Sequence, residues 1–222
     1  MLPLNLDELR DRWAKGERFD LYLFYGHKPP ETGVDASCLS QWFVRGFDVD
    51  GIHYRTAEHW MMAEKGRLFA DDEMVQQIVA SETPREAKAL GRKVRNFDPD
   101  IWNQHKFDIV CRGNHAKFSQ HHDLRKFLTE ITSGNAMPVS SAKNENTDQK
   151  ESSPVLVAES RAAYSVNDES DPQLPIFVEA AGRDRIWGIG LGQNNPKASN
   201  PLTWRGQNLL GFALTKVRDE LR

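Results

Sequence analysis

Cysteine is scarce in this sequence: Cys38 and Cys111 are the two cysteines among 222 residues. They lie in different contexts and have no partners at metal-ligand spacing, so the sequence indicates neither a disulfide framework nor a zinc site. Scarce cysteine also favours a reducing compartment, and we expect a cytoplasmic protein. No residue cluster implies a metal or another cofactor, because even the adjacent His121 and His122 would point in different directions on a helix.

Long hydrophobic runs and an excess of one charge are also lacking. No run approaches the roughly 18 apolar residues of a membrane span, and the N-terminus lacks the basic segment and long apolar core of a signal peptide. The net charge of -3 and the pI near 6.2 exclude a general attraction to nucleic acid or anionic membranes, but not a local basic patch. The composition, 39% hydrophobic and 27% charged, predicts one globular domain over residues 1–222.

Hydrophobic periodicity predicts a predominantly helical α+β fold with a small antiparallel sheet. The expected helices cover residues 4–15, 57–69, 84–94, 99–118, 124–131 and 208–221. The aromatic run at 21–25 predicts a buried strand. Residues 43–49 and 52–54, joined by the turn dipeptide Asp50-Gly51, predict a hairpin. Thr83-Pro84-Arg85-Glu86 supplies an N-cap, a proline at N1 and a glutamate at N3 for the helix that follows.

Residues 133–174 differ from the rest of the chain in composition. They are rich in Ser, Asn, Glu, Asp, Lys and Pro, and apolar residues are sparse. A stretch of this kind can bury little surface, so we expect a flexible insertion within the domain. Three interpretations stay open for it: a disordered spacer, an active-site lid or a docking segment.

The stretch Thr56 to Phe69 places charges in an apolar stripe. Thr56 is a suitable N-cap, and at 3.6 residues per turn one helix face then carries Glu58, Met61, Met62, Lys65 and Phe69. Glu and Lys are seldom buried unless paired, and desolvation moves their pKa values toward the neutral forms. The stripe therefore indicates either a structural ion pair or a reactive site.

Three further features have both a structural and a functional interpretation. The glycines of residues 188–192 could bring backbone amides to a phosphate or form a structural turn, and they match neither GxGxxG nor the Walker pattern. Trp42, Trp102, Trp187 and Trp204 could stack on a ring or fill the core. Asp184, between two arginines, could be an ionised acid of a site or a member of a surface salt bridge.

Taken in order, seven motifs resemble those of the NADAR or YbiA-like family. They are Leu39-Ser40-Gln41-Trp42, Thr56 to Lys65, Ala89-Leu90-Gly91-Arg92, Arg112 to Phe118, Val178-Glu179-Ala180, Asp184 to Gly190 and Trp204 to Gly211. The resemblance covers residues 21–221 apart from the insertion. Seven motifs in order are far more specific than any one of them.

The resemblance implies a mainly helical fold with a small sheet and an N-glycosidase that cleaves at ribose C1, with a nitrogenous ring as the leaving group. Some family members hydrolyse phosphorylated ribosylaminouracil intermediates of riboflavin synthesis, and others remove ADP-ribose from guanine in DNA. A non-catalytic binder of ADP-ribose or nucleotides is the alternative from another class. We expect a small-molecule ribosyl substrate first, with ADP-ribosylated DNA as a second possibility; the sequence says nothing about oligomeric state.

The resemblance also implies roles for particular residues. Lys65 would attack C1 as a neutral amine, Glu58 would act as base or charge partner, and Asp184 would be a second carboxylate. The predicted substrate contacts are Ser40, Gln41, Trp42, Trp102, Asn114, Trp187, Gly188, Gly190 and Asn208. Two residues depart from many relatives, because Met62 stands where they have Gln and Ile189 where they have an acid.

Overall fold

The computed structural model describes residues 1–132 and 174–222. Its α-helices are α1 (Leu6–Ala14), α2 (Ala57–Leu68), α3 (Asp72–Ala80), α4 (Pro84–Gly91), α5 (Pro99–Gln120), α6 (His122–Glu130) and α7 (Leu209–Leu221). Its strands are β1 (Leu21–Phe24), β2 (Phe47–Val49), β3 (Ile52–Tyr54) and β4 (Ile176–Glu179), and two short 3-10 helices are η1 (Ala36–Leu39) and η3 (Pro201–Thr203). The predicted insertion at 133–174 lies outside the described residues except for its last position.

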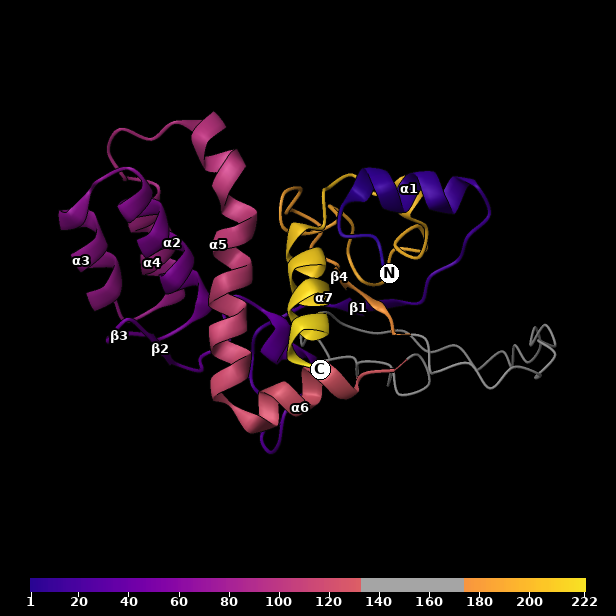
Figure 1. Ribbon diagram of the computed structural model, residues 1–222, viewed down its shortest axis with the longest axis horizontal. Helices are drawn as coiled ribbons and strands as arrows, with labels where there is room; N and C mark the ends of the chain where they lie inside the picture. Colours follow the sequence, from indigo (N-terminus) through magenta and orange to yellow (C-terminus); the bar gives the residue numbers. More distant parts are fainter. Residues whose placement is uncertain (133–173) are drawn as a thin grey trace, which may run out of the picture.

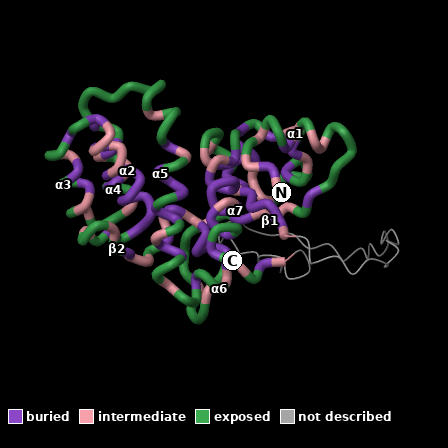
Figure 2. Tube along the Cα trace, viewed as in Figure 1, coloured by how far each residue is buried: buried purple, intermediate pink, exposed green. Residues whose placement is uncertain are grey.

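The long helix α5 divides the molecule (Figure 1). Helices α2, α3 and α4 lie on one side of it, and α7 with strands β1 and β4 and helix α1 lies on the other. Helix α2 packs against α3, α4 and α5, and α7 packs against α5 and β4. Burial follows this arrangement: helix α7 is almost entirely buried, whereas α6 has many exposed residues (Figure 2). The predicted helix-dominated fold is confirmed.

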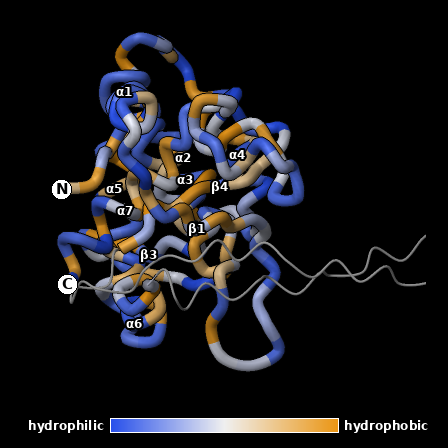
Figure 3. Tube along the Cα trace, turned by 90° about the vertical axis from the view of Figure 1, so that its right-hand side faces the viewer, coloured by the Kyte–Doolittle hydropathy of each residue, from blue (hydrophilic) through white to orange (hydrophobic). Residues whose placement is uncertain are grey.

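Strands β1 and β4 form a parallel pair although about 150 residues separate them in sequence. Leu21 pairs with Ile176 and Phe24 with Glu179. Both are mainly apolar, and both are mostly orange in Figure 3. Strand β4 is buried except at Glu179, whereas half-buried and buried residues alternate along β1. The pairing places the end of β4, where Glu179 stands, beside the loop that follows β1.

The predicted hairpin is confirmed as the antiparallel pair of β2 and β3, in which Phe47 faces Tyr54. Asp50 and Gly51 both have positive φ at its turn, which their residue types tolerate. The first strand is shorter than expected, because it starts at Phe47 and not at residue 43. Residues 41–46 form a turn and an extended segment.

The predicted helix starts are confirmed. The Thr56 side chain accepts from the backbone N–H of His59, and Thr83 and Glu86 form a complete capping box. Helix α3 is an addition to the prediction. Its signals are an N-cap aspartate, Asp71, and the periodic apolar residues Met74, Val75, Ile78 and Val79.

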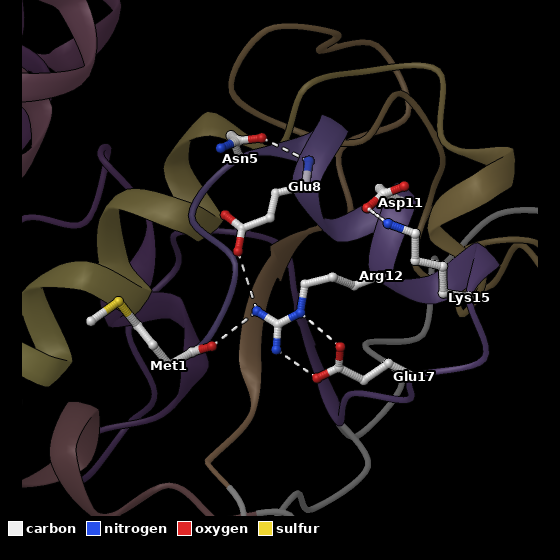
Figure 4. Close-up of polar contacts among 7 residues, drawn as sticks. All are labelled: Met1, Asn5, Glu8, Asp11, Arg12, Lys15 and Glu17. Atoms are coloured by element: carbon white, nitrogen blue, oxygen red, sulfur yellow. Dashed lines mark hydrogen bonds and ion pairs between the residues drawn. The ribbon is translucent and has the colours of Figure 1, made fainter.

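The N-terminal helix α1 is close to its predicted range, and its charged residues form ion pairs with one another and with Glu17. Arg12 forms ion pairs with Glu8 at 3.2 Å and with Glu17 at 2.5 Å, and Lys15 pairs with Asp11 at 2.6 Å (Figure 4). The Asn5 side chain caps the helix by accepting from Glu8 N at 2.8 Å. Exposed pairs of this kind contribute little stability each, so burial of Leu9 is the main attachment of α1.

Candidate active site

Glu58 lies in the first turn of α2 and is buried. The helix packs on three others, so nearly every side chain of its N-terminal half is inside the molecule, and Glu58 is only 2% exposed. Its backbone N–H donates to Gln41 O at 3.0 Å, which joins α2 to the loop after η1. The carboxyl atom Oε1 is buried and has no hydrogen-bond partner among the described residues. Such an atom is rare in folded proteins and marks a place where a ligand can supply the partner.

Burial raises the pKa of Glu58 to about 7. Lys88 and Arg92 of α4, and the Trp42 indole N–H directed at the carboxyl group, lower this pKa, whereas the carboxylate of Asp184 raises it. Burial has the larger effect, so this acid is partly protonated near neutral pH. A carboxyl group in this state can both give and accept a proton.

Glu179 at the end of β4 is a second acid of the same site, and it was not among the predicted site residues. Burial raises its pKa to about 8; Asp184 and Glu58 raise it further, and Lys88 lowers it. The residue is partly exposed, but its atom Oε2 is buried and has no partner within the described ranges. The structure therefore gathers Glu58, Glu179 and Asp184 near Lys88.

Trp42 forms an aromatic wall of this acidic cluster. Its ring centroid is 5.5 Å from that of His27, and the Lys88 amine lies 5.6 Å from its centroid. Its backbone N–H donates to Ser40 Oγ at 3.1 Å. Gln41, the next predicted contact, is buried and its Nε2 lacks a partner in the part of the chain that the structure describes.

The loop that carries Trp42 is held from below by the fully buried Lys117. The Lys117 amine donates to Cys38 O at 2.6 Å and to Ser40 O at 3.1 Å. Burial lowers the pKa of Lys117 to about 8. The Lys117 amine thus fixes the loop through two of its backbone carbonyl groups. The fixed loop in turn determines the position of Trp42.

Lys65 lies about two turns further along α2 than Glu58, close to aromatic side chains. Its Nζ donates to Gly91 O at 2.8 Å, lies 3.9 Å from the Phe97 ring centroid and 5.9 Å from that of Trp102. Burial lowers the pKa of Lys65, and no described carboxylate contributes to the shift. The ion pair with Glu58 that the shared helix face suggested is not formed among the described residues.

Lys65 and Glu58 are about 10 Å apart along the helix axis. The Phe97 ring beside the Lys65 amine packs against Phe69, the C-cap residue of α2, so the amine lies among the aromatic residues at the C-terminal end of the helix. Gly91, which accepts from Lys65 Nζ, packs so closely on Met62 that a Cβ atom there would overlap the Met62 sulfur. Met62 fills the contact between α2 and α4.

The loop that carries Asp184, Gly188 and Gly190 packs against the end of β4. Asp184 Oδ1 accepts from the backbone N–H groups of Ile186 at 2.9 Å and Trp187 at 2.8 Å, and it forms no ion pair within the described residues. Gly188 and Gly190 are buried, and a Cβ on Gly188 would lie 2.8 Å from Glu179 O. The glycines thus let the loop approach the strand closely, next to Glu179.

The two predicted asparagines are completely buried. Asn208, in the left-handed conformation at φ 55°, accepts from Glu179 N at 2.9 Å and donates to Phe177 O at 2.9 Å. Its amide holds strand β4. Asn114 of α5 donates to Val110 O at 2.9 Å, while its Oδ1 has no partner among residues the structure describes. Within the described residues the side chains of both asparagines bond to backbone groups and not to a carboxyl group of the acidic cluster.

A separate hollow of about 400 Å³ lies between α5 and α7. It is lined by Asp108, Cys111, Arg112, His115, Ala116, Lys216 and Glu220. None of the predicted site residues lines it, and none of the buried atoms without partners belongs to it. The acidic cluster of Glu58, Glu179 and Asp184 is therefore a better candidate for the active site than this hollow.

Within residues 1–132 and 174–222 no three His, Cys, Asp or Glu side chains converge as metal ligands would. None of the helices there combines the length and apolar character needed to cross a membrane.

A partly protonated buried acid, a second acid and a half-buried amine beside an indole ring are side chains of the kind that hydrolases of glycosyl bonds use. The comparisons with known proteins agree with this class. The NADAR domain family model matches residues 23–146 and 173–222, so the chain belongs to the NADAR family. The match is interrupted at residues 147–172, inside the predicted insertion.

Curated relatives are named N-glycosidases. One from Acanthamoeba polyphaga mimivirus, N-glycosidase R617, is 34% identical over 90% of this chain and 96% of its own length. Another from Nostoc punctiforme is 29% identical over 83% of this chain and 85% of its own. These relatives place the chain among enzymes that hydrolyse N-glycosyl bonds.

A solved structure shows the same fold. The NMR structure of Escherichia coli YbiA matches with a TM-score of 0.57 over 99% of this chain and 93% of that chain, at 20% identity. In sequence, E. coli N-glycosidase YbiA is 30% identical over 42% of this chain and 55% of its own length. The expected YbiA-like fold is confirmed.

Proposed function

We propose that this chain hydrolyses the C1–N bond of a phosphorylated ribosyl substrate, with a ribosylaminouracil phosphate as the first candidate. The observation that carries the proposal is the buried carboxyl group of Glu58, whose Oε1 has no partner among the described residues and which lies beside the Trp42 indole. Breaking a C1–N bond creates positive oxocarbenium character on the sugar, and a nearby carboxylate stabilises it.

The aromatic wall supports a planar leaving ring. Trp42 and His27 lie against each other at 5.5 Å between centroids, and the cationic Lys88 lies near the indole face. A pyrimidine or purine can stack on such a surface. Trp102 belongs to the other end of the site, 5.9 Å from Lys65 Nζ.

Lys65 keeps the role of nucleophile in this proposal. Attack on C1 needs a neutral amine, and burial lowers the pKa of Lys65 toward that form. The hydrogen bond to Gly91 O holds the amine on the side of α2 that packs on α4. Asp184 is the second carboxylate, held by its own loop and acting on the pKa of Glu58.

The substrate phosphate is assigned to Lys88 and Arg92 on α4. Both act electrostatically on Glu58, and neither forms an ion pair within the described residues. They are one helical turn apart, so both can face the same anion. In this scheme Glu179 is positioned by Gly188, Gly190 and Asn208. Trp187 packs on the main core.

A second candidate is removal of ADP-ribose from guanine in DNA. It is favoured by Arg183 and Arg185, which are exposed on either side of Asp184 and have no ion-pair partner among the described residues. Such a basic rim next to the acidic cluster could contact nucleic-acid phosphates. Release of ADP-ribose from an ADP-ribosylated oligonucleotide tests it.

The deciding experiment is an assay with purified protein. The wild type is expected to release ribose 5-phosphate from the ribosylaminouracil phosphate, and Glu58→Gln is expected to slow this release by about 10²–10⁴-fold. The matched control is Glu82→Gln, an exposed acid outside the site, whose rate should equal that of the wild type. Absence of ribose 5-phosphate with the wild-type protein would remove the proposal.

A further inference from the structure

Glu179 has a more precisely fixed backbone than a strand end requires. Its N–H donates to the buried amide of Asn208 at 2.9 Å. Its carbonyl oxygen accepts from Ala181 N and from Ile189 N, both at 2.9 Å. Three elements thus hold one residue: the strand, the glycine loop and the residue before α7. This arrangement is typical of a side chain whose position matters.

The side chain held in this way is left unsatisfied. Glu179 Oε2 and Glu58 Oε1 are both buried carboxyl oxygens without a partner among the described residues. They come from different elements, β4 and α2, and each is near enough to Asp184 and Lys88 for these charges to act on it. Two such atoms in one cluster indicate that a ligand with hydrogen-bonding groups completes the site.

The charges around Glu179 decide which acid holds a proton. Glu58 of α2 and Asp184 of the following loop face it as anions, and Lys88 of α4 faces it as a cation. Arg92 acts on the neighbouring Glu58. Since three carboxylates exceed the positive charge that Lys88 offers Glu179, the cluster retains a proton near neutral pH. Lys88, Arg92 and the Trp42 N–H all lower the pKa of Glu58, whereas Lys88 alone lowers that of Glu179, so Glu179 is the better holder of the proton.

We infer that Glu179 is the general acid of the reaction, which gives its carboxyl proton to the departing nitrogen of the base. The inference rests on the proposed function. As Lys65 Nζ forms its bond to C1, the C1–N bond breaks, and its electron pair stays on that nitrogen, the amino nitrogen in the aminouracil substrate, which takes the proton of Glu179. Water then attacks C1, its proton returns to the Glu179 carboxylate, and the Lys65 amine leaves.

The test compares two leaving groups on the same ribosyl phosphate. One is the aminouracil, whose nitrogen needs a proton to depart. The other is a nitro-substituted azole, which departs as a stable anion. Glu179→Gln is expected to slow hydrolysis of the aminouracil substrate by about 10²–10⁴-fold and hydrolysis of the nitroazole substrate by less than about tenfold. The loss of rate on the alkaline side of the pH profile, expected near pH 8 in the wild type, should disappear in the variant.

Controls separate this role from a structural one. Gln has nearly the same shape as Glu, so the melting temperature of Glu179→Gln should not fall, and exposed Glu82→Gln should hydrolyse both substrates at the wild-type rate. An active wild type whose Glu179→Gln variant is unimpaired, or loses equal rate on both substrates, overturns the assignment of Glu179 alone. A wild type that cleaves neither substrate overturns the proposed function and the inference with it.

Discussion

The two charged residues on the apolar face of α2, Glu58 and Lys65, lie in different environments. Glu58, in the first turn, is 2% exposed, and its Oε1 lacks a partner among the described residues. Lys65, two turns later, is only half-buried, and its amine is satisfied by Gly91 O and by the Phe97 ring. Burial moves the pKa of both toward the neutral form.

This difference indicates that Glu58 and Lys65 do not serve as a structural ion pair. An ion pair would have restored both ionised forms, whereas separate environments keep an acid that can hold a proton and an amine that can lose one. The other members of the site follow the same division. Lys88, Trp42, Asp184 and Glu179 surround the acid end, and Phe97 and Trp102 surround the amine end.

The largest expected effect comes from the amine end. Lys65→Met keeps the apolar stem but removes the nucleophile, so turnover should fall by about 10³-fold or more while substrate binding persists. Steady-state kinetics and calorimetric titration with ribose 5-phosphate measure the two quantities. Lys126→Met, at an exposed position of α6, is the matched control and should behave as wild type. Unchanged turnover in Lys65→Met would leave the acid end as the sole centre of chemistry.

The pH dependence of the free energy of unfolding tests whether the carboxyl group of Glu58 is buried. The pKa of Glu58 is raised by folding, so the folded chain holds this proton more tightly, and the free energy of unfolding falls as pH rises from about 4.5 to about 7. Glu58→Gln removes this loss and should be more stable than wild type by roughly 2–3 kcal/mol at pH 8, with little difference at pH 4. Urea unfolding at both pH values measures it. Equal stability at pH 8 would mean that the carboxyl group is not buried.

The smallest effect concerns the contact that links the two ends. Gly91→Ala places a methyl group against the Met62 sulfur and should displace the acceptor of Lys65. Because Met62 is flexible, we expect a loss of stability of about 1 kcal/mol and a several-fold lower turnover. Met62→Ala in the same chain should restore part of both, as a double-mutant cycle can show. Additive losses would place the amine away from Met62.

Local signals predicted much of the fold. The turn residues Asp50 and Gly51, the N-cap Thr56 and the capping box at Thr83 each act within four residues, and each is found as expected. Helix α3, which was not predicted, carries local signals of the same kind at Asp71 and Ile78. The parallel pairing of β1 with β4 joins distant parts of the chain, and no local pattern specifies it.

The site divides in the same way. Burial of Glu58 follows from the apolar stripe on α2, which is a property of one helix. Lys88 joins it because α4 packs on α2, and Glu179 because β4 ends near the same group of charges. Glu179 stood in one of the seven family motifs, Val178-Glu179-Ala180, but its segment alone does not predict its neighbours. Lys88 and Arg92, four residues apart on one helix, carried a usable signal for a shared anion.

A crystal structure with ribose 5-phosphate bound to the Lys65→Met chain tests the central claim most directly, namely that the glycosyl bond is broken on the inner face of α2. The account predicts the sugar between residue 65 and the carboxyl groups of Glu58 and Glu179, with its phosphate on Lys88 and Arg92. A sugar in the hollow between α5 and α7, beside Asp108 and Lys216, would contradict it.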